Sequence, residues 1–182
     1  MTTIIVTGVG RSGTSLVAGT LQRLGVPIGA DWQPGIYEDQ PMRRALYHFF
    51  HDERARAIAA YNTHHLKWAF KFPSLHNHMF APELGQFRDP RLVVLWRDAL
   101  SISQRAKAPM HAILREQTRM SEFAHAAKCP VLMASYEKIM AQSATFTTTL
   151  ATFADIKITQ EGLAAALAGF GDRKAYLEAA HE

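Results

Sequence analysis

A glycine-rich segment near the amino terminus has the composition of an anion-binding loop. It reads Gly8-Val9-Gly10-Arg11-Ser12-Gly13-Thr14-Ser15 and lies between a short apolar run and an amphipathic stretch. Glycines such as Gly10 and Gly13 let the backbone curl so that several N–H groups converge on one point, and a following helix adds positive potential there. Ser12, Thr14 and Ser15 in this segment carry hydroxyl groups, and Arg11 carries a permanent positive charge. The segment therefore predicts a phosphate cradle.

The spacing of this segment fits the Walker A pattern G-x-x-x-x-G-K-[ST] at all positions but one. Thr14 stands where that pattern has a lysine, and the nearest cation is Arg11, three residues earlier. The missing lysine normally reaches the β- and γ-phosphates of a triphosphate, so its absence argues against hydrolysis of ATP or GTP. The alternative interpretation is a glycine-rich turn that only joins a strand to a helix.

Short apolar strands and amphipathic helices alternate along the chain. Strands are expected at 4–7, 66–72, 92–96 and 131–134. Helices are expected from the loop to Gly25, from Pro41 through Phe49 and Phe50, from Met110 to Ala124, from Ser143, and from Thr159. This alternation predicts an α/β fold, a three-layer sandwich with a P-loop-like parallel sheet. Ligands of such sheets bind beyond the carboxyl ends of the strands, so chemistry is expected in the loops after the first, third and fourth strands.

Length and composition indicate an ordinary globular protein with a single domain over residues 1–182. The one cysteine, Cys129, excludes an intramolecular disulfide and a multi-cysteine zinc site. No apolar stretch approaches the ~18 residues of a membrane span, and the first residues lack the pattern of a signal peptide. A cytoplasmic protein is therefore expected. The net charge of +4 is scattered rather than gathered in a stripe, which favours a small anionic ligand over a nucleic acid.

The glycine-rich segment resembles the sulfotransferase family that uses 3′-phosphoadenylyl sulfate (PAPS) as its donor, and especially short bacterial sulfotransferase-like proteins. The first segment of that family reads as a strand, then G-x-x-R-S-G-T-S, then a helix that ends L-x-x-L-G. These parts correspond here to Ile4 to Thr7, Gly8 to Ser15, and Leu21 to Gly25. The resemblance implies that the 5′-phosphosulfate is held by Gly10, Arg11, Ser12, Gly13, Thr14 and Ser15.

Four later segments are similar to family motifs in the same order. Gly35 to Asp39 resembles G-[YH]-F-E-D, and Trp68 to Pro73 resembles W-x-x-K-x-P. Leu92 to Asp98 resembles the strand that ends in R-[DN]-P, so Arg97 is implied to bind the 3′-phosphate. Ser135 to Ile139 resembles R-Y-E-x-L, which is interpreted as structural.

The chain departs from the family at two positions near the implied 3′-phosphate site. Ala99 replaces the usual proline, and Arg105 stands where a second phosphate ligand, usually serine, is expected. Arginine can bind phosphate bidentately, and Ser103 lies within a helical turn of it. Arg97, Ser103 and Arg105 are therefore the expected ligands, unless the chain no longer binds the adenosine phosphate.

Sulfuryl transfer requires in-line geometry and stabilisation of charge on the leaving oxygen. Arg11 is the expected cation at that oxygen. Lys71, at the end of a strand, is either a second cation there or a surface ammonium. Glu38 is the expected general base for a hydroxyl acceptor, whereas its neighbour Asp39 is expected to cap the next helix. Two histidines are rival bases, His48 and His65.

The expected donor is PAPS, and the expected acceptor is a hydroxyl or amine of a small molecule or glycan. No metal is expected, because the paired histidines lack a partner at a recognisable zinc spacing. Two alternatives stay open. One is a P-loop nucleotide or metabolite kinase, which the missing lysine opposes. The other is a catalytically silent phosphate-binding protein on the same fold, which Arg105 and the short chain keep possible.

Overall fold

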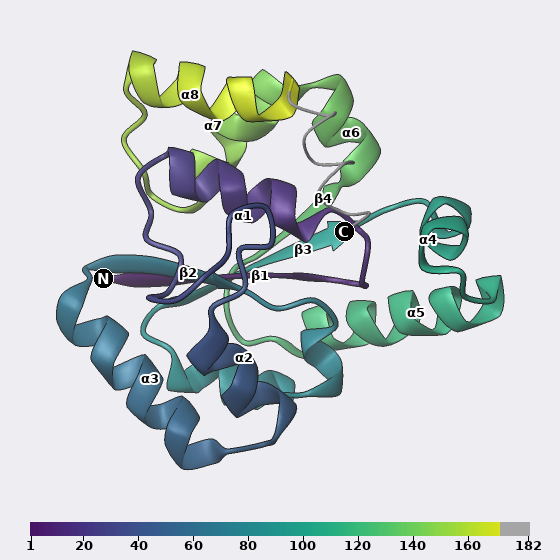
Figure 1. Ribbon diagram of the computed structural model, residues 1–182, viewed down its shortest axis with the longest axis horizontal. Helices are drawn as coiled ribbons and strands as arrows, with labels where there is room; N and C mark the ends of the chain where they lie inside the picture. Colours follow the sequence, from purple (N-terminus) through teal and green to yellow (C-terminus); the bar gives the residue numbers. More distant parts are fainter. Residues whose placement is uncertain (172–182) are drawn as a thin grey trace.

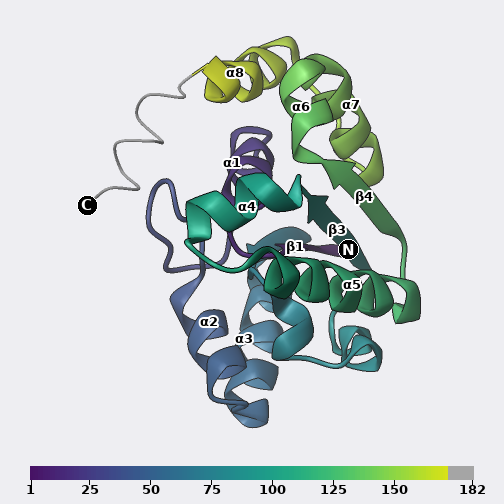
Figure 2. The ribbon, with the colours of Figure 1, turned by 90° about the vertical axis from the view of Figure 1, so that its right-hand side faces the viewer.

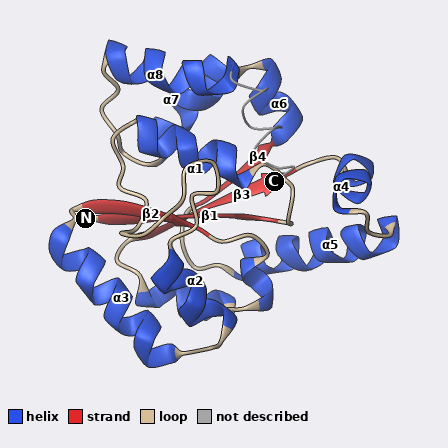
Figure 3. Ribbon diagram, in the orientation of Figure 1, coloured by secondary structure: helices blue, strands red, loops and turns tan. Residues whose placement is uncertain are grey.

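The computed structural model describes residues 1–171, and the sheet at its centre is parallel throughout, in the order β2-β1-β3-β4. Its strands are β1 (Thr2–Gly8), β2 (Lys67–Lys71), β3 (Pro90–Trp96) and β4 (Val131–Ser135). Helices cover both faces of this sheet (Figure 3), which confirms the expected α/β class and parallel sheet. The expectation of one domain extends over residues 172–182, which lie outside the described residues.

Helices from different parts of the sequence form the two outer layers (Figure 1). One face of the sheet carries α1 (Thr14–Arg23), α6 (Tyr136–Ala141), α7 (Ser143–Phe153) and α8 (Gln160–Gly171). The other carries α2 (Gln40–Tyr47), α3 (His51–His64), α5 (Met110–Ala126) and the 3₁₀ turns η1 (Leu75–Asn77) and η2 (Ala81–Gln86). The short helix α4 (Ala99–Ala106) lies beside the carboxyl ends of the strands, above α5 in the turned view (Figure 2).

The strand β1 lies at the centre of the molecule because it is apolar on both faces. Ile4 and Val6 pack with α1 residues such as Leu21 in one apolar cluster. Ile5 belongs to a second cluster on the opposite face, which includes Trp68 and residues of α5. Every residue of β1 is buried, as expected of a strand between two parallel neighbours that is covered on both sides.

The connections that leave β1 and β3 run to opposite faces of the sheet. β1 leads into α1 on one face, whereas β3 leads through α4 into α5 on the other (Figure 1). Parallel sheets open a crevice where neighbouring connections diverge in this way. Because β2 flanks β1 on its other side, with Lys71 paired in register with Val6, the end of β2 also borders the crevice, which extends the expected set of loops.

The helix expected to run from Pro41 through Phe50 ends earlier, at Tyr47. Phe49 adopts a left-handed φ of 53°. Its N–H bonds to the carbonyl of Leu46, and the N–H of Phe50 bonds to that of Ala45. These two bonds form a Schellman motif, which ends a helix and normally has glycine at the left-handed position. The prediction that Phe49 and Phe50 continue the apolar face of this helix is therefore wrong.

Gly13 is a position at which the fold requires glycine. Its φ is +102°, and a Cβ there would collide with the ring of Tyr136 on α6. We expect Gly13→Ala to lower the free energy of unfolding by about 3 kcal/mol, from backbone strain and overpacking together. Gly10→Ala is the matched control, because a Cβ at Gly10 meets nothing within 4 Å. Urea unfolding of both variants measures the difference, and equal losses would contradict this account of the loop.

Candidate functional site

The loop between β1 and α1 has the backbone geometry of an anion cradle. Arg11 and Gly13 have left-handed φ angles of 69° and 102°, and alternation of such residues turns successive N–H groups toward one point. Thr14 is the first residue of α1, and no side chain caps this helix end. The N–H of Leu16 donates to the carbonyl of Gly13 at 3.0 Å, whereas among residues 1–171 no hydrogen bond involves the N–H of Thr14 or Ser15. These two N–H groups are therefore left for solvent or for an anion. The guanidinium-bearing Arg11 is exposed at the rim.

The hydroxyl groups of the loop have different surroundings. Ser12 is fully buried, and among residues 1–171 its Oγ has no hydrogen-bond partner. It lies under the loop, close to where a Cβ on Gly8 would stand. Ser15 is half-buried at the mouth, where its Oγ donates to the carbonyl of Ile36 at 3.2 Å and accepts from Lys71 Nζ at 3.2 Å. Ser15 is thus the hydroxyl that links the loop to the end of β2.

The three residues expected to take part in catalysis, Arg11, Glu38 and Lys71, gather at this mouth. Lys71 Nζ lies 2.8 Å from Glu38 Oε1, and the two side chains are only 3% and 17% exposed. Burial lowers the pKa of the Lys71 ammonium, the charges of Arg11 and Arg43 lower it further, and Glu38 opposes them. Lys71 is therefore a buried, paired cation at the loop rather than a surface ammonium.

Asp39 fixes the carboxylate of the preceding residue, Glu38, in place. Asp39 is the N-cap of α2 and is 1% exposed. Its carboxylate accepts four hydrogen bonds, from the N–H groups of Ala30 (2.9 Å), Asp31 (3.2 Å) and Met42 (3.0 Å) and from the hydroxyl of Tyr61 (2.6 Å). Burial and this carboxylate raise the pKa of Tyr61 well above its usual range. The expectation that Asp39 caps a helix is confirmed, and Glu38 is left to face Lys71.

Arg97, at the end of β3, reaches the cradle from the other side. Its Nη1 donates to the carbonyl of Arg11 at 3.2 Å, and its guanidinium lies 4.3 Å from the centre of the Tyr136 ring. Gln117 of α5 holds the Arg97 carbonyl at 2.7 Å. The same Tyr136 ring packs against Gly13, so it fixes Arg97 relative to the loop. The sequence motif around Tyr136 did not indicate this contact.

The other two residues expected at a 3′-phosphate site lie farther along α4. Ser103 Oγ donates to the carbonyl of Ala108 at 2.6 Å, which helps to end that helix. Arg105 stands in the last turn of α4. The structure thus brings Arg97 to the cradle and places the hydroxyl of Ser103 in a local helix-ending contact.

The two rival histidines lie in different parts of the molecule. The sequence did not predict the contact of another histidine, His76, with Glu116. His65 lies two residues before the start of β2, at the end of the sheet opposite to the loop. His48 is exposed at the end of α2. A buried His76 lies 3.0 Å from Glu116 of α5, and burial lowers the pKa of His76 although Glu116 opposes this. Because these partners are 40 positions apart, no local pattern could have identified them.

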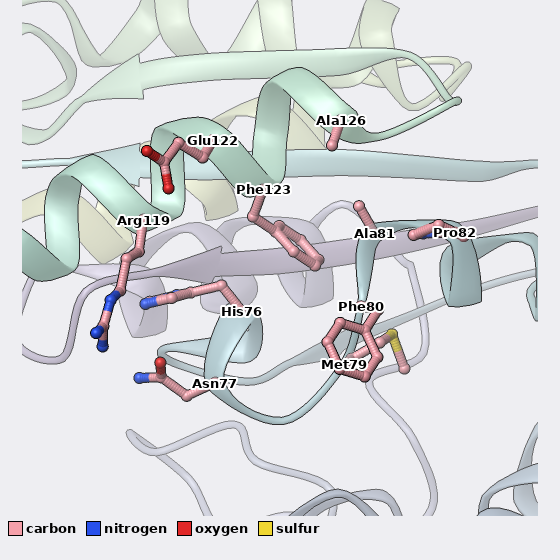
Figure 4. A pocket seen from close by; sticks show the side chains of 10 residues that line it. All are labelled: His76, Asn77, Met79, Phe80, Ala81, Pro82, Arg119, Glu122, Phe123 and Ala126. Carbon is pink, nitrogen blue, oxygen red and sulfur yellow. The ribbon is translucent and has the colours of Figure 1, made fainter.

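Two cavities lie on this side of the sheet, one along α2 and one beside α5. A cavity of about 450 Å³ lies along α2. A groove of about 580 Å³ separates α5 from the segment around η1 and η2 (Figure 4). In Figure 4, Arg119, Glu122, Phe123 and Ala126 of α5 stand opposite the segment that runs from His76 to Pro82. The lining of this groove includes no residue of the cradle, whereas that of the α2 cavity includes Arg43, the partner of Glu38.

Within residues 1–171, no three side chains of histidine, cysteine, aspartate or glutamate cluster as a metal site would require. The same residues contain no helix with the length and hydrophobicity needed to cross a bilayer. No protein-family model and no curated protein matches the chain.

Several solved structures have an arrangement of helices and strands similar to that of this chain. Sulfotransferase STF1 from Mycobacterium tuberculosis H37Rv is 12% identical, with a TM-score of 0.55 over 97% of this chain and 75% of that one. Retinol dehydratase, in complex with androsterone and the inactive cofactor PAP, is 12% identical, with a TM-score of 0.53 over 92% of this chain. The chain spans 64% of that protein.

A sugar kinase from Janibacter sp. HTCC2649 is also similar. It is 14% identical, with a TM-score of 0.54 over 86% of this chain and 95% of the kinase. At these identities the likeness concerns the fold alone. The chain therefore has a sulfotransferase-like, P-loop-like α/β fold.

Because the ammonium of Lys71 is buried, the free energy of unfolding should depend on pH. The pKa of Lys71 in the folded protein lies below the ordinary value, which is about 10.4 in an unfolded chain. Between these two values the unfolded chain binds more protons, so the free energy of unfolding rises with pH in that interval. We expect the wild type to gain stability relative to Lys71→Met as pH rises toward about 10.5. Urea unfolding of both proteins over this range measures the difference, and a constant or falling difference would contradict the assignment.

Proposed function

We propose that the protein is a PAPS-dependent sulfotransferase that transfers a sulfuryl group to a hydroxyl or amine of a small molecule or glycan. In this proposal the loop from Gly10 to Ser15 binds the 5′-phosphosulfate of the donor. The observation that carries the proposal is the contact of Lys71 with both Ser15 and Glu38 at the mouth of the cradle. This contact supports the proposal because it puts a cation beside the loop proposed to bind phosphate, and a carboxylate beside that cation.

Each of these groups has a role in an in-line transfer. Glu38 accepts the proton of the acceptor hydroxyl as the new bond forms between the acceptor oxygen and sulfur. The bond between sulfur and the bridging oxygen breaks, and that oxygen leaves as part of the 5′-phosphate. Arg11, Lys71 and the N–H groups of the loop stabilise the charge on it. The product, adenosine 3′,5′-bisphosphate, carries the remaining phosphates.

Arg97 is the residue that we propose for the 3′-phosphate. Its guanidinium is fixed between the ring of Tyr136 and the carbonyl of Arg11. Stacking leaves the planar fork of a guanidinium able to bind an oxyanion in its own plane. Ser103 and Arg105 lie farther along α4, and we propose them as secondary ligands.

A kinase is the second candidate, because a sugar kinase shares the fold over most of its own length. Thr14 weighs against it. This buried threonine, 4% exposed, occupies the position of the Walker lysine. Because threonine is neutral, it supplies no charge to a γ-phosphate. Lys71 enters the site from β2 instead, where it pairs with Glu38.

The test is the rate at which the protein forms adenosine 3′,5′-bisphosphate from PAPS with a panel of hydroxyl and amine acceptors. We expect Glu38→Gln to lower the turnover number by at least about 100-fold, which is the ordinary effect of removing a general base. Its affinity for adenosine 3′,5′-bisphosphate should stay within about twofold, because Glu38 faces the acceptor rather than the phosphates.

Glu122→Gln is the matched control for this experiment. Glu122 is an exposed glutamate on α5 that lines the groove away from the cradle, so its variant should turn over at the wild-type rate. Equal turnover by Glu38→Gln and the wild type would exclude Glu38 as the base. The absence of product with every acceptor, despite binding of the bisphosphate, would favour a silent phosphate-binding protein.

A further inference from the structure

The cavity along α2 has an unusual lining for an exposed helix surface. We call it the α2 cavity; its volume is about 450 Å³, and it is lined by Gln40, Arg43, Arg44, Tyr47 and His48. Two of these residues are permanent cations and none is acidic. A lining of guanidinium, amide and imidazole groups beside one aromatic ring is complementary to a ligand with negative charge.

The α2 cavity adjoins the proposed catalytic carboxylate directly. Arg43 Nε lies 3.2 Å from Glu38 Oε2, whereas the other oxygen of that carboxylate faces Lys71 at 2.8 Å. Glu38 therefore separates the mouth of the cradle from the cavity. A molecule whose hydroxyl lies against Glu38 at the mouth of the cradle can extend past that carboxylate along α2, toward Arg43.

The guanidinium of Arg43 is held in position before any ligand arrives. It lies 5.0 Å from the centre of the Tyr47 ring. That ring packs in turn against Phe72 and His78, with ring centres 5.1 Å and 4.8 Å apart. An arginine stacked in this way loses less conformational entropy when it forms hydrogen bonds. The orientation of the Arg43 guanidinium thus depends on the packing of Tyr47 against Phe72, the residue that follows Lys71.

The terminal nitrogens of Arg43 remain available. Glu38 uses only its Nε, and among residues 1–171 no hydrogen bond or ion pair involves Nη1 or Nη2. The side chain is 44% exposed. Arg44, its neighbour in the cavity, contacts Glu53 through Nε at 3.7 Å and is 68% exposed. Two guanidinium groups thus present free donors to the same cavity.

We infer that the α2 cavity is an acceptor subsite that selects molecules carrying a carboxylate. This inference rests on the proposed function, because it names the class of acceptor for that site. The two carboxylate oxygens match the paired Nη donors of Arg43, and Arg44 adds a second cation. The hydroxyl to be sulfated lies against Glu38 in the same molecule. The acceptor is therefore a hydroxy acid, with its ring or carbon chain against Tyr47.

Matched pairs of probes that differ only in charge test this inference. One pair is 4-hydroxyphenylacetate and 4-hydroxyphenylacetamide, and the other is glucuronate and glucuronamide. Their dissociation constants are measured by titration calorimetry, both alone and with adenosine 3′,5′-bisphosphate present. We expect the wild type to bind the acid of at least one pair about tenfold more tightly than its amide, as a charge-assisted hydrogen-bonded pair provides.

Substitutions in α2 assign the preference to its residues. Arg43→Gln should reduce the ratio of amide to acid dissociation constants to about one. Arg44→Gln, which leaves the contact between Arg43 and Glu38 intact, should reduce that ratio by a smaller factor. Arg56→Gln removes an exposed cation from α3 that does not line the cavity, so it should leave the ratio unchanged.

The outcomes separate this inference from the proposed function. Equal affinities for acid and amide in both pairs, no binding of any probe, or equal effects of Arg43→Gln and Arg56→Gln would each overturn the carboxylate subsite. Binding of the bisphosphate with no preference for acids would leave the donor site standing. A preference for acids that Arg43→Gln removes, in a protein that binds no bisphosphate, would support the subsite and contradict the sulfotransferase.

Discussion

The ammonium of Lys71 is buried at the end of β2, and the architecture of the site follows from this constraint. A cation with 3% exposure is strongly unfavourable unless an anion and further hydrogen-bond acceptors replace its water. Glu38 and the hydroxyl of Ser15 supply them. To do so, the segment before α2 must lie over the start of α1, where Ile36 accepts from Ser15. Asp39 anchors that segment through four hydrogen bonds. The loop, β2 and α2 thus form one unit.

The charges in this unit are unbalanced in a way that suits an anionic ligand. The charges of Arg11 and Arg43 act on Lys71, and the carboxylate of Glu38 pairs with both Lys71 and Arg43. Burial lowers the pKa of Lys71, and the charges of Arg11 and Arg43 lower it further. The same arrangement gathers cations at the loop although Thr14 stands at the position of the Walker lysine. The cations come from the loop itself and from the neighbouring strand instead of from the first turn of α1.

The sequence predicted the parts of this design that are local, and it missed those that depend on packing. The strands and the glycine-rich loop follow short motifs with clear physical meaning, whereas the ion pair of Glu38 with Lys71 was seen only in the structure. The helix α3 was missed because few of its residues are buried, so it lacks an apolar stripe. The end of α2 was misplaced because Phe49 stands where a glycine would normally signal the stop. Arg97 follows β3 and Tyr136 follows β4, and the stacking of the two side chains depends on the pairing of these strands. No short motif in the sequence predicts this contact.

The central claim is that the cradle binds an adenosine 3′,5′-bisphosphate group rather than a triphosphate. Calorimetric titration of the wild type with adenosine 3′,5′-bisphosphate and with magnesium-ATP tests it without knowledge of the acceptor. The account predicts that the bisphosphate binds and that magnesium-ATP binds at least about tenfold more weakly. It also predicts that Arg97→Ala lowers affinity for the bisphosphate by about tenfold. Tighter binding of magnesium-ATP, or no binding of either nucleotide, would contradict it.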